Sequence, residues 1–150
     1  MDDATGREIA DNLKRKNELL RRMLEITQLQ QAMLDRDDGE GVLRLLDERS
    51  GIMGKIDSLD GTRKRLMRVL SAKAAAELAE KTPEIRQYDG EIRGVVGKLQ
   101  QADEQLKSSM QLKLEEYGKN ARKLREVRQG IDSYTGAGGQ SDGIYLDVRK

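Results

Sequence analysis

VLRLLDERSGIMGKIDSL, residues 42–59, is the stretch that decides the fold. Its apolar side chains recur at alternating steps of three and four residues, which is the spacing of one face of an α-helix. This seam consists of Val42, Leu45, Ile52, Ile56 and Leu59, with Arg49 set among them. Gly51 and Gly54 each cost about 1 kcal/mol relative to Ala, so partner helices must hold the segment by packing. The sequence therefore predicts that this helix is the middle of a helical bundle.

The preceding segment, from Glu8 to about Asp35, is predicted to be a long helix with a diluted apolar seam. Lys16, Thr27 and Gln30 occupy seam positions where a two-stranded coiled coil would carry apolar side chains. We therefore expect a helix whose wide face touches more than one neighbour. Within the middle helix, Arg49 is expected either to pair with an acid across the bundle or to extend its charge outward to water.

Two short stretches are candidate breaks between helices. Residues 37–41, DDGEG, suit a link between antiparallel helices, and either Asp38 or Gly39 is expected to cap the next one. Around Gly61 the pattern allows two interpretations. The helix ends there and Thr62 caps a new one, or it runs straight on with a weak point.

The last long helix has the clearest start in the chain. Residues 82–84, Thr-Pro-Glu, combine a capping side chain, Pro at the first helical position and an acid in the first turn. The apolar rhythm then continues with one extra four-residue step after Leu106, and predicts a helix from Glu84 to Asp132. The Ala-rich residues 71–80 before it are expected to be helical but mobile.

The domain organisation follows from these segments. Residues 1–132 are predicted to be an all-α, elongated antiparallel bundle of about three long helices with coiled-coil-like packing. Residues 133–150 are Gly/Ser-rich at first and are expected to form a flexible tail. The tail ends in the apolar cluster 144–148, which either folds back onto the bundle or binds a partner.

The composition restricts the functional classes. Of 150 residues, 36% are hydrophobic and 37% charged, with neither Trp nor Phe, which fits long amphipathic helices around a thin core. The formal charge of +1 gives no general attraction to nucleic acid or to an anionic membrane. Basic clusters such as residues 14–16 lie among acids, so we interpret them as solvated helix surface. We expect no nucleic-acid partner and no membrane insertion.

Catalytic chemistry has little support in the sequence. Neither Cys nor His occurs, which removes thiolate chemistry, the usual neutral-pH proton carrier and the commonest metal ligands. Acidic pairs such as Glu115 and Glu116 are expected on solvated helix faces, and no phosphate-binding loop motif is present. We therefore expect a protein that is not an enzyme and has no cofactor. The polar N-terminus and the lack of long apolar runs lead us to expect a soluble, cytoplasmic protein.

A family resemblance rests on the middle helix and the tail. Residues 45–49, LLDER, followed by Ile52 and by residues 55–60, KIDSLD, resemble the corresponding stretch of the FlgN-like flagellar export chaperones. The order of a long first helix, this middle helix, a long last helix and a tail is also similar. In the tail, Tyr134 before Gly139-Gln140, and the YLD at residues 145–147 before the terminal Arg-Lys, resemble that family.

The resemblance implies a cytoplasmic chaperone of the flagellar type III export system. Its clients would be hook–filament junction proteins, whose C-terminal amphipathic helices it would keep unassembled. Tyr134 resembles the tail aromatic that docks at the export gate protein.

The last helix is the expected client surface, and the Met residues beside the apolar stripes suit either a core or an adaptable helix groove. The expected client-binding side chains are Leu99, Leu106, Met110, Leu114, Tyr117 and Leu124. The alternative is a structural coiled-coil protein whose apolar stripes are satisfied by self-association, as in a homodimer, and which has no client.

Overall fold

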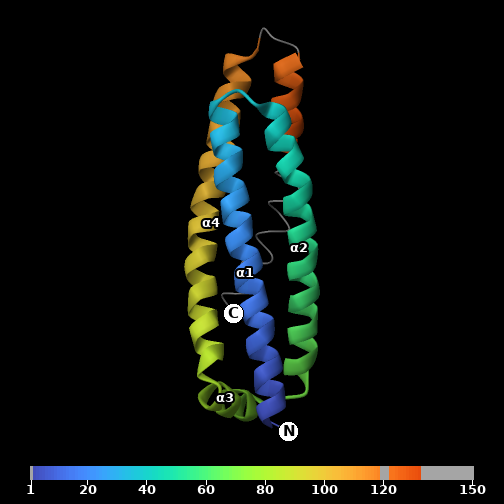
Figure 1. Ribbon diagram of the computed structural model, residues 1–150, viewed down its shortest axis with the longest axis vertical. Coiled ribbons are helices and arrows are strands. Elements are labelled where there is room, and N and C mark those ends of the chain that lie inside the picture. Colours follow the sequence, from blue (N-terminus) through green and yellow to red (C-terminus); the bar gives the residue numbers. More distant parts are fainter. Residues whose placement is uncertain (1, 119–121, 133–150) are drawn as a thin grey trace.

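The computed structural model describes residues 2–118 and 122–132, and shows them as an elongated, all-helical bundle (Figure 1). The labelled helices are α1 (Asp2–Asp35), α2 (Gly39–Arg68), α3 (Ala72–Lys81) and α4 (Pro83–Glu116). A further helix covers residues 122–132. No β-strand occurs within these two ranges, so the predicted all-α class is confirmed. In the same part of the chain, no helix is long and apolar enough to cross a membrane.

The three long helices lie side by side along the long axis of the molecule. α1 and α4 run in one direction and α2 runs in the other, while α3 crosses the end where α1 begins (Figure 1). The helix over residues 122–132 lies at the opposite end, beside the start of α2. The predicted tail, residues 133–150, lies outside the described residues.

The bundle differs from the prediction of about three long helices, because five helices are present in the described residues and two of them are short. The expected continuous helix from Glu84 to Asp132 does not form. α4 ends at Glu116, Tyr117 and Gly118 form a turn, and the chain is helical again from residue 122. Gly118 favours this end because glycine readily leaves the helical conformation at a C-terminus. The apolar rhythm continued in sequence, but it belongs to two helices.

The centre of the bundle is α1, and the prediction that the helix over residues 42–59 holds this place is wrong. α1 packs closely against both α2 and α4, whereas the backbones of α2 and α4 make little contact with each other. The expectation that the first helix has a wide face touching more than one neighbour is confirmed. Lys16, Thr27 and Gln30 are all buried, so the polar seam positions widen this face instead of weakening it.

The local signals explain how the helices begin. Asp38 caps α2, since the Gly41 amide donates to its Oδ1 at 2.9 Å, and Asp37 before it adopts a left-handed conformation with φ of 61°. α2 runs uninterrupted through Gly61, so the second of the two interpretations is correct and Thr62 is not a cap. Pro83 occupies the first turn of α4 as predicted.

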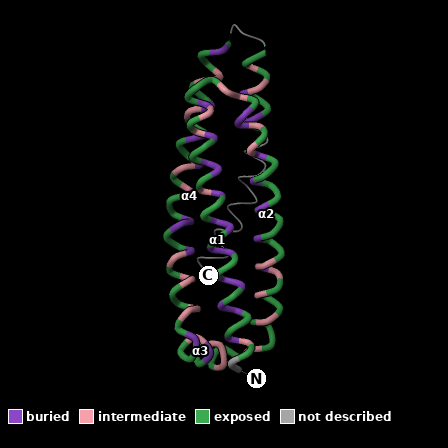
Figure 2. Tube along the Cα trace, viewed as in Figure 1, coloured by how far each residue is buried: buried purple, intermediate pink, exposed green. Residues whose placement is uncertain are grey.

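The core consists of two apolar clusters, one in each half of the bundle. Figure 2 shows buried positions on the inward sides of the long helices and exposed positions on their outer sides. The cluster toward α3 is formed by α1, α2 and α4 with Leu78 of α3. The second, which we call the upper cluster, adds Val127 from the helix over residues 122–132. Its buried members are Leu34, Val42, Leu46, Leu106, Met110, Tyr117 and Val127.

Candidate functional site

In the upper cluster, the helix over residues 122–132 adds to the core formed by the long helices. α4 contributes Leu106 and Met110, which are 0% and 1% exposed. Leu114 from the same helix is half-buried and packs against the cluster. From the other side, Val127 inserts with 6% exposure. The surface formed by α2 and the second half of α4 therefore already holds a helix of the same chain.

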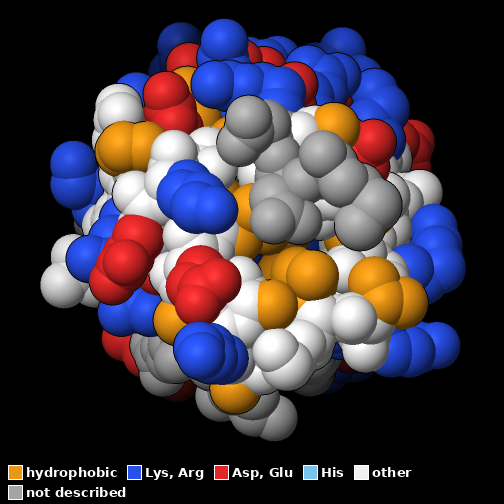
Figure 3. All heavy atoms as spheres, turned by 90° about the horizontal axis from the view of Figure 1, so that it is seen from below, with side chains coloured by type: hydrophobic (Ala, Val, Ile, Leu, Met, Phe, Trp, Pro, Cys, Tyr) orange, Lys and Arg blue, Asp and Glu red, His pale blue; other side chains and the backbone are white. Residues whose placement is uncertain are grey.

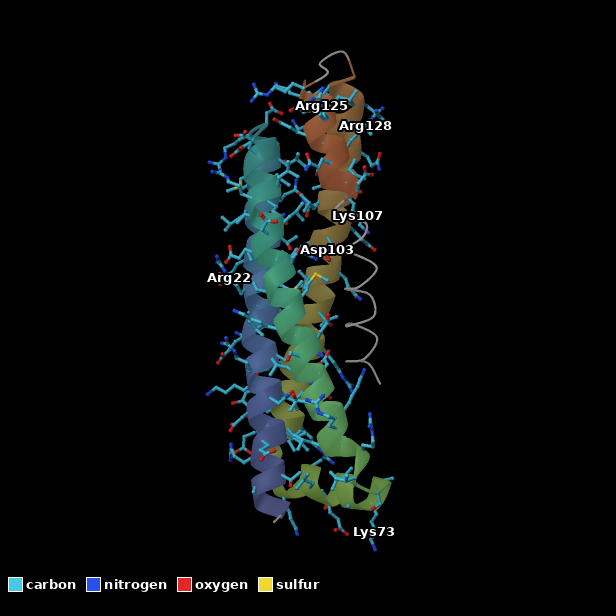
Figure 4. All side chains as sticks on the ribbon, turned by 90° about the vertical axis from the view of Figure 1, so that its right-hand side faces the viewer. Arg22, Lys73, Asp103, Lys107, Arg125 and Arg128 are labelled. Atoms are coloured by element: carbon cyan, nitrogen blue, oxygen red, sulfur yellow. The ribbon has the colours of Figure 1, made fainter. Side chains whose placement is uncertain are left out.

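The helix over residues 122–132 has a narrow apolar face. Val127 is its buried apolar side chain, and Leu124 and Ile131 are half-buried. Six of its eleven residues are charged, and Arg125 and Arg128 among them are exposed (Figure 4). An isolated helix of this length is marginal in water, so packing on the upper cluster must supply its stability.

Gly130 is the point where this helix lies close to side chains of α2 and α4. It is buried, and a Cβ built on it would lie 3.8 Å from Met110 Cε and 3.9 Å from Leu43 Cδ2. These are ordinary contact distances, so an Ala fits at this position. A longer side chain would have to displace the side chains of α2 and α4.

Tyr117 lies where α4 ends and contacts the upper cluster. Its side chain is buried, and its hydroxyl finds no hydrogen-bond partner among the described residues. The ring lies under two ammonium groups, with Lys123 Nζ 4.9 Å and Lys113 Nζ 5.6 Å from its centroid. A buried polar atom that lacks a partner carries a free-energy cost that a suitable neighbour would relieve.

Lys113 connects this end of α4 to the turn between α1 and α2. Its Nζ lies 2.9 Å from Asp37 Oδ1. The hydrogen bond with the Asp37 carboxylate raises the pKa of Lys113, and burial opposes it. The pair therefore holds α4 against the α1–α2 turn at neutral pH.

The predicted client-binding residues fall into three groups. Leu106, Met110, Leu114 and Tyr117 come together in the upper cluster. Leu99 is fully buried in the other cluster, among side chains of α1 and α2. Leu124 lies on the helix that covers the upper cluster, and Tyr134 lies outside the described residues.

Val127 and Gly130 were missed by the sequence analysis. Val127 belongs to the upper cluster and Gly130 lies close to Met110 and Leu43, but the pattern for one continuous helix from Glu84 to Asp132 gave neither residue an inward position. The signal that could have found them is Gly118 with Asn120, a pair of residues typical of a helix end. A new helix starting after that pair has its apolar positions at Leu124, Val127 and Ile131.

Arg49 pairs with an acid across the bundle, as one of the two sequence interpretations predicted. Its Nη1 and Nη2 each lie 3.0 Å from an oxygen of Asp103 on α4, which is labelled in Figure 4. Arg49 also donates to the Thr27 hydroxyl of α1, so one side chain joins all three long helices. A second polar layer lies nearer α3, where Lys16 Nζ and Arg63 Nη2 each lie 2.8 Å from Asp60 Oδ1.

A cavity of about 350 Å³ opens at the α3 end. Apolar side chains including Ile9, Leu78 and Ile85 line it, and Arg86 and Arg93 stand on the α4 side. Viewed from this end, apolar side chains gather near the middle with Lys and Arg around the edge (Figure 3). Within the described ranges, no group of three or more acidic residues is arranged to hold a metal ion. This end therefore offers an apolar hollow with charged side chains in its lining.

Comparison with known proteins gives one family. The family model described as FlgN protein matches residues 1–142, which is most of the chain. No curated protein and no solved structure matches the chain significantly. The match includes α1 to α4 and the helix over residues 122–132.

Proposed function

The chain belongs to the FlgN family and is thus a flagellar export chaperone, and from this premise we propose how it works. It binds the C-terminal amphipathic helix of hook–filament junction proteins in the cytoplasm. By covering the apolar face of that helix it prevents premature assembly, and it then delivers the client to the export gate protein.

The observation that supports this proposal is the upper cluster, a surface of α2 and α4 that accommodates a helix. An amphipathic helix binds in such a groove through side chains spaced three and four residues apart. The proposed client contacts are Leu106, Met110, Leu114 and Tyr117, all of which belong to this cluster. We exclude Leu99 and Leu124 from the proposed client contacts. Leu99 is buried in the other cluster with side chains of α1 and α2, and Leu124 lies on the helix over residues 122–132, which covers the upper cluster.

Size-exclusion chromatography with light scattering tests the proposal. The protein is run alone and with the C-terminal segment of a hook–filament junction protein from the same organism. We expect a discrete one-to-one complex. If a stable homodimer forms instead and no complex appears, the proposal is wrong and the self-associating coiled-coil alternative is favoured.

Two substitutions on α4 localise the binding surface. Leu114 packs against the upper cluster, whereas Leu112, two residues away, is 66% exposed. Leu114→Asp should abolish the complex, and Leu112→Asp should leave it intact. Circular dichroism on both variants controls for folding. Equal binding by the two variants would place the client elsewhere.

Tyr134 remains our proposed contact with the export gate protein. Tyr134→Ala should leave the complex with the junction protein unchanged and should abolish capture by the gate protein in a pull-down. Loss of client binding in this variant would assign the side chain to the client instead.

A further inference from the structure

We propose that the helix over residues 122–132 is an intramolecular occupant of the client groove, which must leave before the client helix binds. This inference rests on the proposed function and adds its regulation. The free chaperone is then closed, and the client helix is selected by how well it replaces the contacts of this segment.

The first step of the argument is burial. Leu106 and Met110 are almost inaccessible, at 0% and 1% exposure, and Val127 of the short helix belongs to the same cluster. One face of a side chain cannot contact two helices at the same place. A client helix that uses this face must therefore take the position of residues 122–132.

The second step is the difference in how the helices are anchored. The three long helices are joined by buried ion pairs, Arg49 with Asp103 and Lys16 with Asp60. The short helix is attached by Val127, by two half-buried apolar side chains, by close approach at Gly130 and by the Lys123 ammonium over the Tyr117 ring, and its ion pair, Arg122–Glu126, is internal. Elements with few buried apolar contacts open at low free-energy cost, so this helix is the one that can leave while the bundle stays folded.

The third step is the unsatisfied Tyr117 hydroxyl, which is buried at the edge of the groove without a partner among the described residues. The helix over residues 122–132, which we call the resident helix, therefore fits the groove imperfectly. A client helix that brings a carboxylate or amide oxygen to this hydroxyl makes a hydrogen bond that the resident helix does not make. This gives the client an advantage beyond apolar contact.

The resident helix also indicates which pattern of apolar and small side chains a client helix needs. Its apolar side chains, Leu124, Val127 and Ile131, follow the three–four spacing, and Gly130 gives close approach to Met110 and Leu43. A client helix on the same path needs the same spacing and a Gly or Ala immediately before the last apolar position. A larger residue there should weaken binding at least tenfold.

A reversible cross-link tests the displacement in the full-length chain. A Cβ built on Gly39 would lie 3.2 Å from the Cβ of Glu126, close to the roughly 3.5–4.5 Å that a disulfide spans. Because the chain has no Cys, the Gly39→Cys/Glu126→Cys variant forms one defined disulfide between α2 and the short helix. The oxidised protein should bind the junction-protein segment at least thirtyfold more weakly than the reduced protein.

A matched cross-link at the other end controls for general stiffening. A Cβ built on Gly6 would lie 3.5 Å from the Cβ of Thr82, so Gly6→Cys/Thr82→Cys joins α1 to the residue between α3 and α4. Its oxidised and reduced forms should bind the segment equally well. Val127→Ala provides the opposite perturbation, because it weakens the closed state, and should tighten binding about tenfold.

The outcomes separate this inference from the proposed function. Equal binding by the oxidised and reduced Gly39→Cys/Glu126→Cys variant overturns the displacement and leaves the chaperone function standing. No binding by the wild type or by any reduced variant overturns the proposed function itself. A dimer that exchanges residues 122–132 between two copies, with no client complex, overturns the assignment of the groove to a client.

Discussion

The buried ion pair between Arg49 and Asp103 gives the sharpest test of how this thin-cored bundle is held together. Asp103→Ala removes the carboxylate that receives both guanidinium hydrogen bonds, each 3.0 Å long. The Arg49 side chain is 1% exposed and that of Asp103 is 12% exposed, so water cannot easily replace the lost partner. The variant keeps the buried guanidinium of Arg49 and removes the carboxylate that faces it.

The expected cost follows from this geometry. Two unit charges about 4 Å apart attract by about 4 kcal/mol at an effective dielectric constant of 20. Removing one partner of a buried pair typically destabilises a protein by about 3–5 kcal/mol. For a chain of this size, each kcal/mol lowers the melting temperature by about 2–4 °C, so Asp103→Ala should melt about 10 °C lower.

Urea unfolding followed by circular dichroism measures the change in the free energy of unfolding. The combined variant Arg49→Met/Asp103→Leu should lie within about 1 kcal/mol of the wild type, because both charges of this pair are then replaced by apolar side chains. The control is Glu48→Ala, which breaks the exposed pair of Arg22 and Glu48 at 2.7 Å and should cost far less than the buried pair, because water screens it. If Asp103→Ala costs no more than this control, the pair does not hold the long helices together.

Three further changes test local features of the fold. Gly51→Ala and Gly54→Ala should each raise the free energy of unfolding by up to about 1 kcal/mol in urea titrations. Both glycines are exposed in α2, and a Cβ would meet nothing within 4 Å. A loss of stability would contradict the exposed helical position of these residues. Asp38→Ala should cost about 1 kcal/mol in the same assay, since it removes the cap of α2. Because Asp37 raises the pKa of Lys113, this pair should stabilise the protein below the ordinary lysine pKa of about 10.4, and the stability should fall as the pH rises through the higher folded-state pKa. Melting curves of Lys113→Met and the wild type should converge there, and a constant difference at high pH would refute the assignment.

The helices themselves were largely predictable, because the signals that define them are local. Asp38 as a cap and Pro83 in a first turn depend on neighbours in sequence, and both are confirmed. The place of α1 at the centre was harder to predict. Lys16 and Gln30 look unfavourable in a core until their partners are known, and these are Asp60 and the Val42 carbonyl on another helix.

The partner of Arg49 illustrates the same difficulty. The sequence predicted an acid across the bundle but not which one, since Asp103 is 54 positions away and lies beside the apolar seam of its helix instead of on it. A polar residue is buried or exposed depending on what the facing helix offers. Periodicity of one helix alone therefore cannot decide such positions.

The expected client-binding residues remain a prediction, but the structure shows which of them lie together. Leu106, Met110, Leu114 and Tyr117 do gather on one face, but that face is covered in the monomer. The sequence analysis missed the covering helix because its apolar residues continue the rhythm of α4 beyond Gly118. Nothing in the spacing indicates that the chain reverses direction there, and a glycine alone does not distinguish a weak point from a turn.

Under the proposed function, the contrast between the two kinds of packing would let the chaperone bind a client helix while the three long helices stay folded. Buried ion pairs require matched partners and fix the register of α1, α2 and α4, so these helices cannot slide to fill an empty groove. Apolar contacts such as those of Val127 are less specific, and a second helix of similar spacing can replace them. The affinity for a client is then the difference between two packings on one rigid surface. Weakening the resident helix should tighten binding, whereas weakening the Arg49–Asp103 pair should destabilise the surface for both helices.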